Sequence, residues 1–284
     1  MKTTIQLAVL IFTLLSSADL HAYEVMRSES GDPLHWTRDD MPLEWYLNKD
    51  GCPDLPFEDT LIALESAFDS WQGVDCSYVE FKYAGTRETS DFGPNAHNTP
   101  DFKNTISWVE SDWPDEWTEA YAVTIPAYDL SNGRIVDADM EFNADWFTWA
   151  ILSGASSEKP DLQNIATHEI GHFIGLDHAD DIEASLYPFG VPGELHKRTL
   201  AEDDIFGICN LYPLEGASGW PCGNDDDCSG GRKCIVNSDT QNSLCSQSCY
   251  CDQDCLPVME CINDYCMPKR HEIGHDMGDT CSIS

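Results

Sequence analysis

The sequence predicts an α+β fold, because strand-like segments come first and a histidine-bearing helix comes later. Residues 41–48 (MPLEWYLN) have the composition of a strand, and residues 134–143 alternate apolar and polar side chains. Between them lies a run whose apolar side chains recur at helical spacing before Gly73 ends the helix: Phe57, Leu61, Leu64, Phe68 and Trp71. Further strands are predicted at residues 78–83 and 121–125.

The strand at residues 134–143 follows a turn sequence, Ser131-Asn132-Gly133. One of its faces is apolar, with Val136, Ala138, Met140 and Phe142. The other carries three carboxylates, Asp137, Asp139 and Glu141. These are candidate calcium ligands, since calcium prefers several hard oxygens. The alternative is a charged face that discourages edge-to-edge aggregation.

Residues 1–22 have the layout of a secretory signal peptide. Lys2 precedes an apolar run at residues 5–15, and small residues follow, with cleavage expected after Ala18 or Ala22. The alternative, a membrane anchor, needs about 20 apolar residues, and this run is too short. We therefore expect a secreted, extracellular protein without a membrane span.

Cysteine content divides the remaining chain. Of 13 cysteines, ten lie in residues 216–284, whereas residues 23–215 have ordinary globular patterning. This predicts one larger domain followed by a cysteine-rich module and a polar tail. Because exported proteins meet oxidising conditions, we expect disulfides, with at least one cysteine left over.

The chain is strongly acidic, with 51 acidic and 15 basic residues and a formal net charge of −36. This charge argues against nucleic acid or an anionic membrane surface as a partner. High solubility, calcium binding and a saline habitat each fit it, and the sequence does not separate them.

Residues 168–178 (HEIGHFIGLDH) form the pattern HExxHxxGxxH. On a helix, His168 and His172 project from one face and can bind one metal ion. Gly175 can take the positive φ that ends a helix, which turns the chain back and brings His178 to the same metal. The pattern predicts a single catalytic zinc ion with three histidine ligands.

Glu169 directly follows the first ligand, so it can accept a proton from zinc-bound water without ligating the metal. We expect it to be the general base. A bare HExxH can arise by chance, but the added glycine and third histidine argue against coincidence. Pro160 and Asp161 mark a helix start, and an apolar face surrounds the motif: Leu162, Ile165, Phe173 and Leu176.

With this motif, residues 30–213 resemble the matrixin branch of the metzincins. The order of helices and strands, the acidic strand before the catalytic helix and the closing segment at residues 199–213 are all similar to that branch. The resemblance implies a metzincin-type catalytic domain in residues 23–215 that hydrolyses peptide bonds of proteins. It also implies a substrate extended along an edge strand, by position Tyr121, Ala122, Val123 and Thr124.

The family has a methionine-containing turn beneath the zinc, followed by Tyr-Pro. Here Leu186 stands in place of the methionine. Leucine and methionine are close in volume, so the hydrophobic floor should survive at a cost below about 1.5 kcal/mol. The resemblance further implies that Tyr187 and Pro188 shape the pocket for the side chain after the scissile bond.

Three departures from the family are visible. Ala179 follows the third histidine, where matrixins usually have serine. No long propeptide and no PRCGxPD cysteine switch is found, and Gly51-Cys52-Pro53-Asp54 is only faintly similar to the switch. Only His97 lies where the family has a histidine cluster for a structural zinc, so we expect one zinc ion.

In the first domain, Cys52 and Cys76 flank the predicted helix and are the expected disulfide pair, with free thiols as the alternative. The tail suggests two disulfide-stapled units, one with Cys222, Cys228, Cys234 and Cys245 and the other with Cys251, Cys255, Cys261 and Cys266. Their connectivity and the module's ligand stay unknown. Zinc knuckles are a weaker alternative, because no CxxC occurs.

Residues 271–275 repeat HEIGH. A polar tail, a second metal site with Cys281, and a latency segment are the alternatives for it.

The leading hypothesis is a secreted zinc endopeptidase acting on protein or peptide substrates. Two rivals stay open: a binding or adhesion protein whose protease fold has lost turnover, and a zinc amidase acting on cell-wall peptides. The intact ligands and Glu169 argue against the first rival.

Overall fold

The computed structural model describes residues 23–88, 100–117, 120–154, 157–236, 243–250, 255, 259–262 and 264–268. Four features singled out in the sequence lie outside the described residues: the predicted signal peptide, His97, Cys251, and the second HEIGH with Cys281.

A five-stranded sheet forms the centre of the larger domain, with strand order β2-β1-β3-β5-β4. β1, β2, β3 and β5 pair in parallel, and β4 runs antiparallel to β5 at one edge. Their bounds are β1 Leu43–Asn48, β2 Phe81–Arg87, β3 Thr105–Val109, β4 Ala122–Tyr128 and β5 Ile135–Asn143. The predicted α+β domain is confirmed, but the strand expected at residues 78–83 begins at Phe81, and β3 was not predicted.

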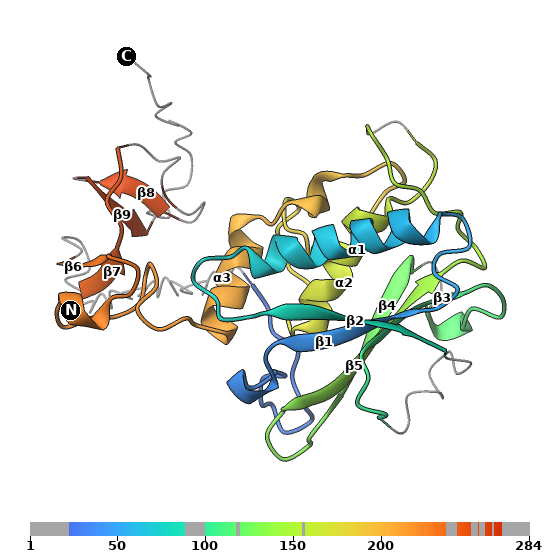
Figure 1. Cartoon of the computed structure of the whole chain (residues 1–284), viewed down its shortest axis with the longest axis horizontal. Coiled ribbons are helices and arrows are strands. Elements are labelled where there is room, and N and C mark those ends of the chain that lie inside the picture. Colours follow the sequence, from blue (N-terminus) through green and yellow to red (C-terminus); the bar gives the residue numbers. More distant parts are fainter. Residues whose placement is uncertain are drawn as a thin grey trace, which may run out of the picture.

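Two helices, α1 (Phe57–Gln72) and α2 (Leu162–Phe173), cover one face of this sheet (Figure 1). Aromatic side chains join the layers. Trp45 of β1 stacks on Phe68 of α1 with ring centroids 4.6 Å apart, and the rings of Phe68 and Phe173 meet edge to face at 6.0 Å. All three are buried. Burying such a side chain contributes about 1.5–3 kcal/mol, so this cluster fixes α2 against the sheet.

The last helix of the domain, α3 (Glu202–Leu211), is tied to the end of α1 by the disulfide Cys76–Cys209. The expected Cys52–Cys76 pair is therefore wrong, and Cys52 is a buried free thiol. The physical reason is the length of α1. Its 16 residues extend over about 24 Å and separate the two flanking cysteines.

The cysteine-rich region contains two small hairpins, β6 (Lys233–Val236) with β7 (Ser243–Ser246), and β8 (Met259–Ile262) with β9 (Tyr265–Pro268). The first unit carries the disulfides Cys222–Cys234 and Cys228–Cys245, as grouped from the sequence. The second carries Cys249–Cys261 and Cys255–Cys266, so Cys249 occupies the place expected for Cys251.

Short 3-10 helices complete the described chain: η1 Arg38–Asp40, η3 Asp115–Trp117, η4 His196–Arg198 and η5 Asp225–Asp227. No described helix combines the length and hydrophobicity needed to cross a membrane.

Candidate metal centre and active-site cleft

Both ends of α2 are fixed by specific residues. At its start, the Asp161 side chain accepts a hydrogen bond from the Asn164 N–H at 2.8 Å, a cap that stabilises a helix by about 1 kcal/mol. Just beyond its end, Gly175 has φ +91°, and a Cβ there would lie 2.2 Å from the Leu34 carbonyl oxygen. Only glycine fits this position, and the predicted positive φ is confirmed.

The turn at Gly175 brings three imidazoles together. The Nε2 atom of His172 lies 3.2 Å from Nε2 of His168 and 3.2 Å from Nε2 of His178. Nitrogen ligands at about 2.0–2.1 Å from a tetrahedral zinc ion would lie about 3.3 Å apart, so the three side chains fit such an ion. They also form a group suited to metal binding among the described residues.

Backbone carbonyls set the tautomers of two ligands. Nδ1 of His168 lies 2.7 Å from the Ser185 carbonyl oxygen, and Nδ1 of His172 lies 2.8 Å from that of Leu176. Since a carbonyl only accepts, each Nδ1 carries the proton and each Nε2 keeps its lone pair. Burial lowers the pKa of His172 to about 4, which keeps its imidazole in the neutral form that binds metals.

A hydrophobic contact supports α2, the helix that carries the HExxH motif. Leu186 is buried, and its side chain packs so closely on Gly171 that a Cβ at Gly171 would lie 2.5 Å from Leu186 Cδ2. The Asp204 carboxylate holds the turn by accepting from the N–H groups of Ser185 at 2.7 Å and Leu186 at 3.1 Å. Leu186 thus occupies the position that the sequence indicated.

Glu169 is 4% exposed, on the same helix as His168. Burial raises the pKa of its carboxyl to about 7, and a hydrogen bond from Thr124 opposes this rise. The Thr124 hydroxyl donates to Glu169 Oε2 at 2.7 Å. A residue expected to contact substrate therefore also orients the expected general base.

A cleft of about 580 Å³ runs past the histidines and Glu169. One wall is the edge strand β4 with the residue before it, including all four positions expected to pair with substrate: Tyr121, Ala122, Val123 and Thr124. A second wall contains Pro188, Phe189, Gly190 and Lys197. Tyr187 is not among the lining residues, and its ring instead lies near Phe189, with centroids 5.7 Å apart.

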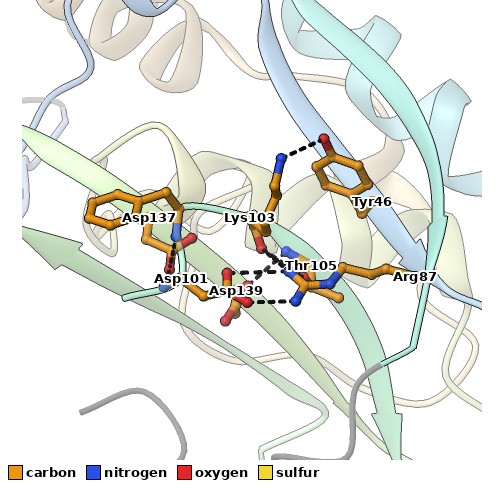
Figure 2. A network of polar contacts seen from close by, with 8 residues as sticks. Tyr46, Arg87, Asp101, Lys103, Thr105, Asp137 and Asp139 are labelled. Atoms are coloured by element: carbon orange, nitrogen blue, oxygen red, sulfur yellow. Dashed lines mark hydrogen bonds and ion pairs between the residues drawn. The ribbon is translucent and has the colours of Figure 1, made fainter. Parts of the chain in front are cut away.

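The acidic strand forms a separate network (Figure 2). Asp137 Oδ2 accepts from the N–H groups of Asp101 at 2.9 Å and Phe102 at 3.1 Å, and Asp139 Oδ1 accepts from Thr105 N at 2.7 Å. Arg87 pairs with Asp101 beside them.

The alternative of a charged edge face is wrong for two reasons. β5 lies inside the sheet, and Asp137 and Glu141 are 5% and 1% exposed, respectively. Asp137 Oδ1 has no hydrogen-bond partner among the described residues, and burial together with Asp139 raises the pKa of Asp137 to about 6.

Comparison with known proteins decides the family. The matrixin family model matches residues 35–213. The chain belongs to the matrixin family. It is 30% identical over 179 residues to Metalloendoproteinase 1 of Glycine max, covering 50% of this chain and 57% of that protein. It is 31% identical over 180 residues to Metalloendoproteinase 1-MMP of Arabidopsis thaliana, covering 62% and 44%.

Interstitial collagenase of Equus caballus is 29% identical over 161 residues, covering 56% of this chain and 29% of that protein. The chain thus spans between about a third and just over half the length of these matrixin relatives.

Three features around the histidines and Glu169 were not predicted from sequence. They are the Thr124 bond to Glu169, the Ser185 carbonyl behind His168, and the position of Lys197 in the cleft wall. Each depends on segments brought together by the fold, and no spacing in the sequence signals them.

Proposed function

We propose that this protein is a secreted zinc-dependent endopeptidase that hydrolyses peptide bonds of protein substrates. The observation that carries the proposal is the convergence of three Nε2 atoms beside a buried glutamate, in a cleft bordered by an edge strand. His168, His172 and His178 would hold the zinc ion. When bound there, zinc activates water and polarises the scissile carbonyl.

The protein's own residues move the proton. Glu169 accepts it from the attacking water and passes it to the leaving amine, because its raised pKa suits both transfers near neutral pH. Thr124 fixes one carboxylate oxygen and leaves the other for the water. These contacts support a general-base role for Glu169.

The cleft walls suit an extended peptide. β4 is at the edge of the sheet, so residues 121–124 can offer unpaired backbone groups to a substrate strand. Pro188 forms part of the second wall of the cleft. The substrate would therefore lie between these walls, with the side chain after the scissile bond next to Pro188.

The test is cleavage of an unfolded protein by residues 23–284, beside the Glu169→Ala variant and a chelated sample with zinc added back. We expect cleavage that disappears in the variant and returns with zinc. A folded, zinc-loaded wild type that cleaves no protein would contradict the proposal. Cleavage confined to cell-wall peptides would favour the amidase, and binding without turnover would favour the adhesion protein.

As a second proposal, the Asp137 network binds calcium. The supporting observation is Asp137 Oδ1, a buried carboxylate oxygen to which no described residue donates a hydrogen bond, next to Asp139. Glu141 is the third expected ligand. Calcium-dependent thermal stability that is absent from Asp137→Asn would support this site, whereas equal stability with calcium and with chelator would contradict it.

We also propose that the catalytic domain ends near residue 215 and that the cysteine-rich module binds a ligand of its own. Its disulfides give it a scaffold that does not depend on a large core.

A further inference from the structure

Lys197 is a buried cation in the wall of the cleft. The residue is 2% exposed, yet it lines the cleft together with His168, Glu169 and Ile165. In an acidic chain it is the sole lysine or arginine among the described lining residues. A buried ammonium is costly unless its N–H groups find acceptors, so its bonds indicate what it does.

Two acceptors belong to the wall itself. Lys197 Nζ donates to the carbonyl oxygens of Tyr187 and of Phe189, the latter at 3.1 Å. These residues flank Pro188, and the Lys197 carbonyl in turn accepts from the Ser185 hydroxyl at 3.1 Å. Lys197 therefore fixes the position of the wall segment, residues 187–189, and also places a positive charge in the lining of the cleft.

An ammonium has three N–H donors, and no described residue accepts the third. Among the described residues, no carboxylate lies within 4.0 Å of Nζ. Glu194, Glu169 and Asp204 act on it only at longer range. Glu194 is already engaged by His196 at 3.0 Å and by the Val191 N–H at 3.2 Å.

We propose that Lys197 makes the cleft select, just after the scissile bond, a side chain that ends in an oxygen acceptor, glutamine or glutamate. This inference rests on the proposed function. Ile165, Tyr121 and Phe189 contact the aliphatic part of such a side chain, and its terminal oxygen accepts the third N–H of Lys197. An aliphatic side chain of the same length would fill the space but leave that donor unsatisfied.

The nearby carboxylates act differently on the two acceptors. Because Glu169 and Glu194 offset part of the lysine charge, a neutral amide oxygen gains the hydrogen bond without repulsion, whereas a carboxylate gains attraction and meets repulsion. The chemistry shared by glutamine and glutamate is the terminal oxygen, and the experiment compares them directly.

The test starts with zinc-loaded wild-type protein and a mixed peptide library, with cut sites read by mass spectrometry. Three peptides follow that are identical except for glutamine, glutamate or methionine after the cut. Methionine matches glutamine in length and lacks the acceptor. We expect kcat/KM to be at least about tenfold higher for the better of the glutamine and glutamate peptides than for methionine, as a hydrogen bond to a charged donor would give.

The variants Lys197→Met and Lys197→Arg provide the control. In the Met variant, the ratio of kcat/KM for the better of the glutamine and glutamate peptides to kcat/KM for the methionine peptide should fall to one or below, mainly through KM. The Arg variant should retain part of the wild-type preference. Peptide affinity for Glu169→Ala, measured by calorimetry, should show the same ranking without turnover. If Lys197→Met does not fold, the wild-type ranking decides.

Equal or better cleavage of the methionine peptide would overturn the inference, leave the proposed function intact, and reduce Lys197 to a support of the wall. If neither the peptides nor an unfolded protein were cleaved, both the inference and the proposed function would be contradicted.

Discussion

Two clusters of polar side chains in this matrixin domain have the composition of metal sites, and they differ in how their ligand atoms are occupied. In the histidine cluster, His168 and His172 each use one nitrogen on a backbone carbonyl and turn the other toward a shared space. In the acidic cluster, backbone N–H groups occupy Oδ2 of Asp137 and Oδ1 of Asp139, while Asp137 Oδ1 has no partner among the described residues. A metal site thus depends on which ligand atoms the chain leaves unpaired, as well as on residue type.

The largest predicted effect separates the two clusters. His172→Ala removes the central ligand and should abolish protein cleavage, by about 10⁴-fold or more, because catalysis depends on the metal. Asp139→Asn keeps an acceptor for Thr105 N–H and should leave turnover within about threefold. Parallel assays of the two purified variants on one substrate test this contrast. Comparable losses in both would mean that the acidic cluster is also catalytic.

Removal of one hydroxyl near Glu169 should have a smaller effect. The Thr124 hydrogen bond lowers the pKa of Glu169, so Thr124→Val should raise it. Glu169 must be ionised to accept a proton, so the acid limb of the plot of kcat against pH should move to higher pH. At pH 7, kcat should be reduced about tenfold. Thr124→Ser, which retains the hydroxyl, is the matched control. An unmoved acid limb in Thr124→Val would mean that Thr124 does not act on Glu169.

The acidic cluster should instead affect stability. Burial raises the folded-state pKa of Asp137 from 3.8 to about 6, so the folded protein holds this proton more tightly than the unfolded chain. Stability from this group is greatest below 3.8 and is lost as pH rises through about 6. In chelator, Asp137→Asn should therefore be more stable than wild type at pH 8, by about 2 kcal/mol, and not at pH 3.5.

Denaturant unfolding at the two pH values measures this difference. Calcium should close the gap at pH 8 by stabilising the wild type. A variant that is less stable than wild type at pH 8 in chelator would show that the Asp137 carboxylate is already compensated within the fold.

The smallest effect is expected from a substitution at Leu186, which packs against α2. Leu186→Met restores the residue usual in the family and changes side-chain volume little, so the free energy of unfolding should change by less than about 1.5 kcal/mol. Thermal unfolding and kcat/KM measure it. A change in kcat/KM of more than about threefold would mean that this floor tunes the metal centre and does more than support α2.

The histidine cluster was predictable from sequence because its geometry is local. One helix and one glycine turn place His168, His172 and His178, and every signal lies within eleven residues. The acidic cluster was predicted in composition but not in environment, because segment 100–105 covers it from a distant part of the chain.

The other misses share this cause. The partner of Cys76 lies 133 residues away on α3, whereas a nearer cysteine, Cys52, lies at the far end of a rigid helix. Lys197 donates hydrogen bonds to two carbonyls of the wall segment. Its buried position follows only from the tertiary structure. Local spacing therefore predicted the histidine cluster, whereas the contacts around it come from the tertiary structure.

The most direct test of the central claim is a count of metal ions per chain. Elemental analysis of the purified wild type, with His172→Ala beside it, should give one zinc ion per wild-type chain and none in the variant. A wild type that binds no zinc, or a variant that retains it, would show that the three convergent imidazoles are not the metal site.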